Sequence, residues 1–352
     1  MNFTPDYRNI LDVLNNKKPK RLPLYEHIIS SVIMEKILNN PFAELIAGDR
    51  DDKVEFFNNY CQFFKQMTYD TVSYEFCISE ILPDHGAIMG GKPGPIQTRE
   101  DFEKFPWDEL PTRFWEKAEP QFQALVKSLP AGMKAIGGVG NGVFEISEDL
   151  VGYEYLSYMQ IDYPELYADL FKKIGDLMKT IWDRFLKYYT DYFVGCRFGD
   201  DLGFKTNLLL SPETIKQHIL PQYKRIIDAV HQANKPFLYH SCGCIFDMME
   251  DVIEIGIDAK HSNEDVIAPY DRWIELYGDR IGLFGGIDVD LLCQEKPEKI
   301  TEKIVKLGTK FRKIAKGYAL GSGNSIPDYV PVEGYLAMVR AAQRIRLDEQ
   351  KY

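Results

Sequence analysis

The sequence predicts an α/β protein, a (β/α)8 barrel, from three observations. From Pro23 onward, short apolar runs rich in β-forming residues alternate with longer amphipathic stretches, the pattern of repeated βα units around a parallel sheet. The chain has 352 residues, 45% of them hydrophobic, and so exceeds the ~250 residues that such a barrel needs. Polar side chains follow several of the apolar runs. We therefore expect one barrel domain over residues 1–352, with an N-terminal helical extension.

Eight apolar runs are expected to form the strands, namely 22–28, 71–76, 134–139, 192–198, 236–240, 257–261, 281–286 and 317–321. Between them, residues 164–189 carry apolar side chains at spacings of three and four, which predicts a helix, as does the pattern of 212–232. Ser211 followed by Pro212 is typical of a helix start, and Pro297 opens another helix in the same way.

Two longer segments, 83–111 and 138–152, exceed the minimal repeat. Both follow predicted strands on the face where barrel enzymes build their sites, so we expect loops that wall the pocket or simply decorate it. The second segment begins Gly-Val-Gly-Asn-Gly, which lacks both the lysine-containing end of a phosphate loop and the full dinucleotide-binding spacing. A nucleotide site is not expected there.

Charge and composition exclude several classes of partner. A net charge of -11 argues against nucleic acid, which needs clustered Lys and Arg. No apolar run approaches the ~18 residues that span a bilayer, and the first residues resemble no signal peptide, so we expect a cytoplasmic protein without a membrane partner. The six cysteines are scattered through a long chain, which favours free thiols or metal ligands over disulfides.

The strongest candidate site is the pair His240 and Cys242. Alternation along a strand places both side chains on one side at the mouth of the barrel. Imidazole and thiolate are ligands that zinc favours, so the pair is interpreted as half of a zinc site. The alternative is a histidine and a cysteine that merely pack in the core. Cys244, beyond the turn, is interpreted as a loop thiol.

Further polar side chains are expected at the same face because they follow other predicted strands. Asp200, Asp201 and His261 are candidate catalytic residues, and one aspartate should have a raised pKa if the two lie close together. The candidate substrate-binding residues are Glu26, Asn263, Asn324 and Phe144. For the polar residues among these candidates, the alternative is a structural role in which the side chain caps a helix or binds a loop amide.

With these residues in view, the chain resembles the uroporphyrinogen decarboxylase superfamily, and within it the corrinoid-linked methyltransferase branch. The resemblance covers nearly the whole length. It is carried by the segments 200–203 (DDLG), 210–213 (LSPE), 220–224 (LPQYK), 240–243 (HSCG), 285–288 (GGID) and 321–327 (GSGNSIP).

The resemblance implies chemistry that this chain matches only in part. The decarboxylases hold porphyrinogen carboxylates with an arginine-rich segment after strand one, and here that region has no arginine pair. The methyltransferases hold zinc through a His-x-Cys pair and a further cysteine near the last strand. His240 and Cys242 match the pair, but Ser322 lies in the region of the further cysteine. Glu75 is the first choice for the missing ligand, Glu26 the second and His261 the third.

The favoured interpretation is a zinc-dependent methyltransferase that moves a methyl group from a small donor, a methoxylated aromatic or another methyl ether or alcohol, to the Co(I) corrinoid of a separate carrier protein. A ligand set of nitrogen, sulfur and oxygen suits activation of a donor oxygen. One alternative is a decarboxylase or other lyase that acts on a carboxylated substrate without metal, with His240 as general acid and Cys242 as a packed thiol. Another is a non-catalytic protein that keeps the barrel.

Overall fold

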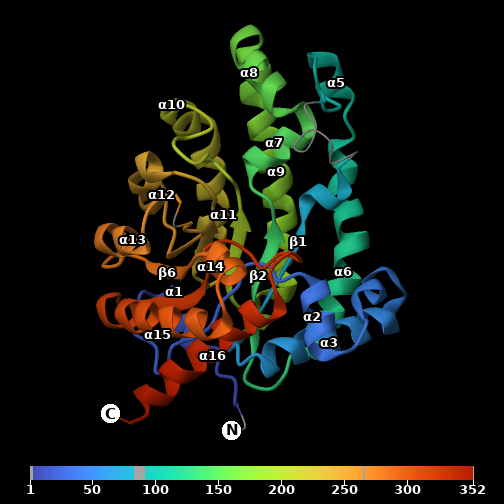
Figure 1. Ribbon diagram of the computed structural model, residues 1–352. Coiled ribbons are helices and arrows are strands. Elements are labelled where there is room, and N and C mark those ends of the chain that lie inside the picture. Colours follow the sequence, from blue (N-terminus) through green and yellow to red (C-terminus); the bar gives the residue numbers. More distant parts are fainter. Residues whose placement is uncertain (1–2, 83–91, 265, 352) are drawn as a thin grey trace.

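The computed structural model describes residues 3–82, 92–264 and 266–351, and its centre is one parallel sheet (Figure 1). Neighbouring strands follow the chain order from β1 to β7, and every pairing is parallel. The strands are β1 (Thr71–Cys77), β2 (Lys134–Gly140), β3 (Phe193–Gly199), β4 (Phe237–His240), β5 (Ala259–His261), β6 (Gly282–Ile287) and β7 (Tyr318–Ser322). The predicted α/β barrel fold is confirmed.

The segment expected as strand one lies beside β7 without forming a regular strand. Leu24 makes a parallel bridge to Leu320 of β7, and the Tyr25 N–H donates to the Leu320 carbonyl over 2.9 Å. A Cβ on Gly321 would lie 1.8 Å from the Tyr25 carbonyl oxygen, so this close approach requires glycine. The prediction of a regular strand over 22–28 is therefore wrong, and Pro23, which has no N–H to donate, limits the ladder.

Helices surround the sheet, and shorter ones follow the carboxyl ends of the strands (Figure 1). α1 lies at the opposite end of the strands, and its Ile10, Val13 and Leu14 pack with Val194 and Phe284 into a buried cluster. The helices are α1 (Arg8–Leu14), α2 (Ser31–Leu38), α3 (Arg50–Gln66), α5 (Arg99–Lys104), α6 (Leu110–Ser128), α7 (Val143–Val151), α8 (Tyr153–Asp162), α9 (Pro164–Tyr189), α10 (Pro212–Thr214), α11 (Leu220–Gln232), α12 (Met249–Glu254), α13 (Tyr270–Tyr277), α14 (Val289–Gln294), α15 (Pro297–Ile314) and α16 (Val332–Glu349). α1 is the first helix of the described chain.

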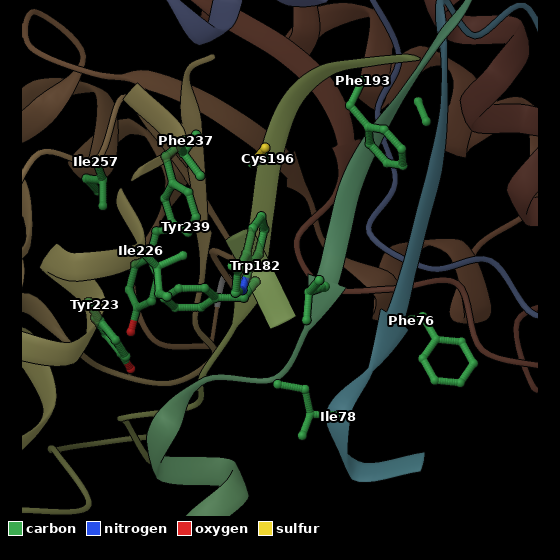
Figure 2. Close-up of a cluster of buried hydrophobic side chains, with 14 of the residues drawn as sticks. Phe76, Ile78, Trp182, Phe193, Cys196, Tyr223, Ile226, Phe237, Tyr239 and Ile257 are labelled. Atoms are coloured by element: carbon green, nitrogen blue, oxygen red, sulfur yellow. The ribbon is translucent and has the colours of Figure 1, made fainter. Parts of the chain in front are cut away.

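The main hydrophobic core lies between the sheet and its outer helices. Figure 2 shows Trp182 of α9 together with Tyr223 and Ile226 of α11 near side chains of β3 and β4. α9 has the predicted bounds and buries apolar side chains at spacings of three and four. The helix predicted over 212–232 is interrupted by a π-helical turn at Ile215–Ile219, between α10 and α11.

One of the two expected loops is largely helical. Within 138–152, β2 continues to Gly140 and α7 occupies Val143–Val151. The glycines predicted a loop, but they allow close packing instead, because a Cβ on Gly142 would meet the Asp200 carboxylate at 2.2 Å. The other segment, 83–111, contains α5, and its residues 83–91 lie outside the described part of the chain.

A buried arginine lies inside the barrel below the strand ends. The Arg197 side chain has no exposed surface, and its guanidinium donates to Glu75 Oε2 over 2.8 and 2.9 Å, to the Tyr25 hydroxyl over 2.6 Å and to Ser73 Oγ over 2.9 Å. The pairing of β2 with β3 shifts by one residue before Gly195. Such a bulge re-aims the side chains that follow, and here Arg197 and Val194 both face the interior, which strict alternation would forbid.

Replacing Arg197 should test how far this charge cluster holds the barrel together. Arg197→Met leaves the Glu75 carboxylate buried without its partner, so the free energy of unfolding in urea should fall by about 3–5 kcal/mol. The matched control is Arg113→Met on α6, which breaks an exposed ion pair with Glu109. This change should lower the free energy of unfolding by less than about 1 kcal/mol.

Adding Glu75→Met to Arg197→Met removes both charges and should restore most of the lost stability. Equal stability of Arg197→Met and the unmodified protein would contradict a structural role for this ion pair.

Candidate active site

Three histidines meet at the carboxyl ends of the segment 22–28, of β4 and of β5. His27, His240 and His261 are 8%, 5% and 0% exposed. The rings of His27 and His240 stack with their centroids 3.8 Å apart, and the centroids of His240 and His261 are 5.0 Å apart. Burial lowers the pKa of His261 to about 3 and holds the pKa values of the other two well below the usual range. All three rings are therefore neutral at physiological pH.

Hydrogen bonds determine which ring nitrogen carries the proton in His240 and His261. His261 Nε2 lies 3.1 Å from the Ser322 carbonyl oxygen, which can only accept, so this nitrogen carries the hydrogen. His261 Nδ1 is then an acceptor and receives a hydrogen bond from His240 Nδ1 over 2.8 Å. His240 Nε2 is left with a free lone pair, 3.5 Å from Cys242 Sγ. This is the form of histidine that binds a metal ion.

Cys242 and Asp201 complete a group of three different ligand types around that lone pair. One ligand atom each from His240, Cys242 and Asp201 lies within 4.8 Å of the others. The Asp201 carboxylate also accepts the Cys242 backbone N–H over 2.7 Å. Burial, and then the neighbouring Asp201 charge, raise the pKa of the Cys242 thiol, so the thiol keeps its proton without a cation. Sulfur, nitrogen and oxygen in this arrangement fit a zinc ion.

Glu75 lies outside both groups of candidate metal ligands in the described residues. The second such group is His27, His240 and His261, but the Nδ1 atoms of His240 and His261 already bind each other. Glu75 Oε2 accepts from Arg197, and Glu75 Oε1 lies 3.7 Å from His27 Nε2. The structure therefore points to Asp201 where the sequence pointed to Glu75.

Glu26 is held by Ser322. The Glu26 side chain is 1% exposed and accepts the Ser322 N–H over 2.8 Å, and the Ser322 hydroxyl donates to its other oxygen. Burial raises the pKa of Glu26 to about 8. Because the Ser322 carbonyl also accepts from His261, one residue connects Glu26 to the histidines.

Asp200 holds helix α7 in place. It accepts the backbone N–H groups of Phe144 and Glu145 over 2.9 and 2.8 Å and the hydroxyl of Tyr223. Burial raises the pKa of Asp200 to about 7, in agreement with the expected raised pKa for one of the two aspartates. The side chain of Phe144 has no exposed surface. In this structure Asp200 and Phe144 position α7 over the site.

The two candidate asparagines differ in their surroundings. Asn263 binds the Phe284 carbonyl through Nδ2 and the Gly286 N–H through Oδ1, so both ends join β5 to β6. Asn324 Nδ2 lies 3.4 Å from Cys242 Sγ and 2.8 Å from Glu264 Oε1. Asn324 and Glu264 also line a cavity of about 550 Å³, beside Lys205, Asp288 and Tyr329. Asn324 therefore lies between this cavity and Cys242.

Three charged residues at this end of the barrel were not predicted. Arg197 and Lys260 each interrupt an apolar run in the sequence, and this pattern could have indicated a buried charge. Lys260 Nζ donates to the Ser262 and Ser241 carbonyls and lies 4.5 Å from the Trp273 ring centroid. Burial lowers the pKa of Lys260 to about 7. Glu145 accepts the Asp201 N–H over 3.2 Å, and no sequence pattern pointed to it.

Among the described residues, no helix is both long enough and apolar enough to cross a bilayer.

Comparisons with known proteins agree with this architecture. A methyltransferase from Methanosarcina mazei has a similar structure, with a TM-score of 0.74 at 15% sequence identity over 96% of this chain and 97% of that chain. Xylanase B from Clostridium stercorarium F9 gives a TM-score of 0.44 at 10% identity, over 78% of this chain and 90% of that chain. A glycoside hydrolase family 5 enzyme from Prevotella bryantii B14 gives 0.43 at 11% identity, over 97% and 100%. The last two scores are too low to indicate a common fold.

No curated protein matches the chain. The sequence model of uroporphyrinogen decarboxylase (URO-D) matches residues 8–345, nearly the whole length. The chain therefore belongs to the uroporphyrinogen decarboxylase family.

Proposed function

We propose that the chain is a zinc-dependent methyltransferase that moves a methyl group from a small oxygen-bound donor to the Co(I) corrinoid of a separate carrier protein. The observation that carries this proposal is the group of His240, Cys242 and Asp201, whose ligand atoms lie within 4.8 Å of one another at the mouth of the barrel. The similarity of the fold to a protein described as a methyltransferase supports the same reaction class.

Zinc at these three residues would supply Lewis-acid polarisation of the donor oxygen, which makes the departing alkoxide or phenolate more stable. The residues of the chain prepare the position. His261 holds His240 in the tautomer with a free Nε2 lone pair, and the Asp201 carboxylate fixes the Cys242 backbone. With one oxygen ligand in place of a thiolate, the set is harder than one built on sulfur, which suits an oxygen-bound methyl group.

The cavity that Asn324 connects to Cys242 offers the donor a place to bind. The cavity of about 550 Å³ that reaches Asn324 has the volume expected for a small-molecule site. The Asn324 amide, next to Cys242 Sγ, can orient a polar group of the donor. The carrier protein would dock over the strand ends and present the corrinoid, which acts as the nucleophile.

A spectroscopic assay tests this proposal. The zinc-loaded protein, reduced free cobalamin as acceptor and a panel of methoxylated aromatics, methyl ethers and methanol should give the absorbance of methylcobalamin with at least one donor. Release of carbon dioxide from carboxylated compounds without any methyl transfer would instead identify a lyase.

Two cysteines two positions apart allow a matched test of the metal site. Cys242→Ala removes the sulfur ligand, so the zinc content by metal analysis should fall from about one per chain to near zero, together with methyl transfer. Cys244→Ala removes a thiol that is not part of either ligand group in the described residues, and zinc and activity should be retained. Full zinc content in Cys242→Ala would exclude the proposed ligand set.

The hydrogen bond from His240 to His261 can be tested separately. His261→Leu removes the acceptor that fixes the His240 tautomer, so zinc affinity measured by chelator competition should fall by about 10–100-fold. His231→Leu is the control, since His231 is partly exposed and pairs with Asp258 away from the site. An unchanged zinc affinity in His261→Leu would show that His261 does not position the ligand.

A further inference from the structure

A second cavity, into which two arginines project, lies at the amino-terminal end of the strands, away from the proposed metal site. Its volume is about 420 Å³. Arg21 comes from the segment that leads into the first bridge, Thr68 precedes β1 and Arg346 lies near the end of α16. The lining also includes Phe3, Gln343 and Gln350. None of these residues takes part in the proposed reaction.

Arg346 is buried with one donor group unpaired. The residue is 7% exposed, its Nε donates to the Leu22 carbonyl over 2.6 Å, and its Nη1 donates to the Thr68 carbonyl and hydroxyl oxygens over 2.9 and 3.0 Å. Its Nη2 is buried and has no hydrogen-bond partner in the described part of the chain. All of the partners are neutral oxygens, so no carboxylate neutralises this guanidinium directly.

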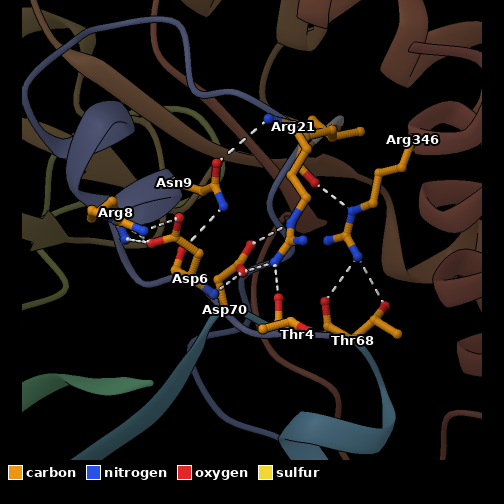
Figure 3. Close-up of polar contacts among 9 residues, drawn as sticks. Thr4, Asp6, Arg8, Asn9, Arg21, Thr68, Asp70 and Arg346 are labelled. Carbon is orange, nitrogen blue, oxygen red and sulfur yellow. Dashed lines mark hydrogen bonds and ion pairs between the residues drawn. The ribbon is translucent and has the colours of Figure 1, made fainter. Parts of the chain in front are cut away.

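Arg21 presents a second free guanidinium end beside the first. Its Nη2 donates to Asp70 Oδ1 and to the Thr4 carbonyl, whereas its Nη1 has no partner among the described residues. Figure 3 shows the two groups next to each other, with the ends that carry no dashed line turned toward one another. The Phe3 ring centroid lies 4.5 Å from the Arg21 Cζ and 5.6 Å from the Arg346 Cζ. Two cations thus share one small space.

The charges around this space do not balance. Asp70 is fully buried and pairs with Arg21. Glu349 is engaged elsewhere, because it accepts from Arg312 over 2.7 Å and from the Leu22 N–H over 3.1 Å. Burial lowers the pKa of Arg346 only to about 10, so the group stays charged at neutral pH. Two guanidinium groups with one carboxylate leave one positive charge, and a buried unpaired charge is costly.

We infer that this cavity binds a small oxyanion, free phosphate or the phosphate group of a small metabolite, between Arg346 Nη2 and Arg21 Nη1. Guanidinium donors in a fixed fork match phosphate oxygens, and an anion here would supply the missing negative charge. The amides of Gln343 and Gln350 offer neutral donors on the cavity wall. The volume leaves room for the remainder of a phosphorylated metabolite.

Inorganic phosphate is the first probe. Compared with chloride at equal ionic strength, saturating phosphate should raise the Tm of the full-length protein by at least about 2–4 °C, because a ligand that binds only the folded state stabilises it. Arg346→Gln should lose this increase. Arg340→Gln, which alters an exposed arginine on the same helix, should retain it.

A second variant guards against misfolding of Arg346→Gln, since that side chain also holds two carbonyls. Gln343→Glu places a carboxylate of nearly equal size on the cavity wall, so it should supply the anion internally and abolish phosphate binding in equilibrium dialysis with labelled phosphate. Glycerol 3-phosphate distinguishes the two sources of the ligand: binding at least about tenfold tighter than phosphate indicates a metabolite, and equal binding indicates free phosphate.

Two results would overturn the inference. One is the absence of phosphate binding to the unmodified protein up to about 10 mM, a concentration that detects even weak sites. The other is an equal Tm increase in the unmodified protein, Arg346→Gln and Gln343→Glu, which would show that phosphate acts on the surface in general.

Discussion

The ion pair between Arg197 and Glu75 is the constraint on which the rest of the site depends. A guanidinium without exposed surface must have a partner, and Glu75 supplies it from β1, two strands away in the sheet, together with the hydroxyls of Tyr25 and Ser73. These bonds join β1, β3 and the segment 22–28. The ion pair also engages the Glu75 carboxylate, so in the proposed site an oxygen ligand would come from another strand end. Asp201, after β3, is in reach.

Burial and the positive charge of Arg197 together explain why His27, His240 and His261 stay neutral. Burial is the main cause of their low pKa values, and the positive Arg197 contributes to each of them. A neutral histidine ring has one nitrogen that donates and one that accepts. The Ser322 carbonyl can only accept, so it decides that His261 Nε2 is the donor and thereby fixes the direction of the hydrogen bonds. The chain of bonds ends with the free lone pair of His240, at the point where Cys242 and Asp201 converge.

Much of the fold and of the candidate site could be predicted from the pattern of neighbouring residues in the sequence. The rest depends on contacts between residues that are far apart in the sequence. Alternation at a strand end was enough to bring His240 and Cys242 together. The pairing of Glu75 with Arg197 could not be predicted in this way, because a bulge in β3 turns the Arg197 side chain inward. The glycines of 138–152 predicted a loop, but they make room for α7 against Asp200. In each case a long-range packing contact decided between local alternatives.

Ser322 shows how the departure from the methyltransferase pattern bears on the proposed chemistry. Its carbonyl accepts from His261, and its N–H and hydroxyl both donate to Glu26, so it is fully engaged in holding other groups. A residue in this state is not a free ligand, whereas a cysteine in the same region would offer a thiolate. In the proposed ligand set, the carboxylate of Asp201 would therefore supply oxygen in place of a second sulfur beside His240 and Cys242. Oxygen ligands leave a zinc ion a stronger Lewis acid than thiolates do, and this favours a substrate whose leaving atom is oxygen.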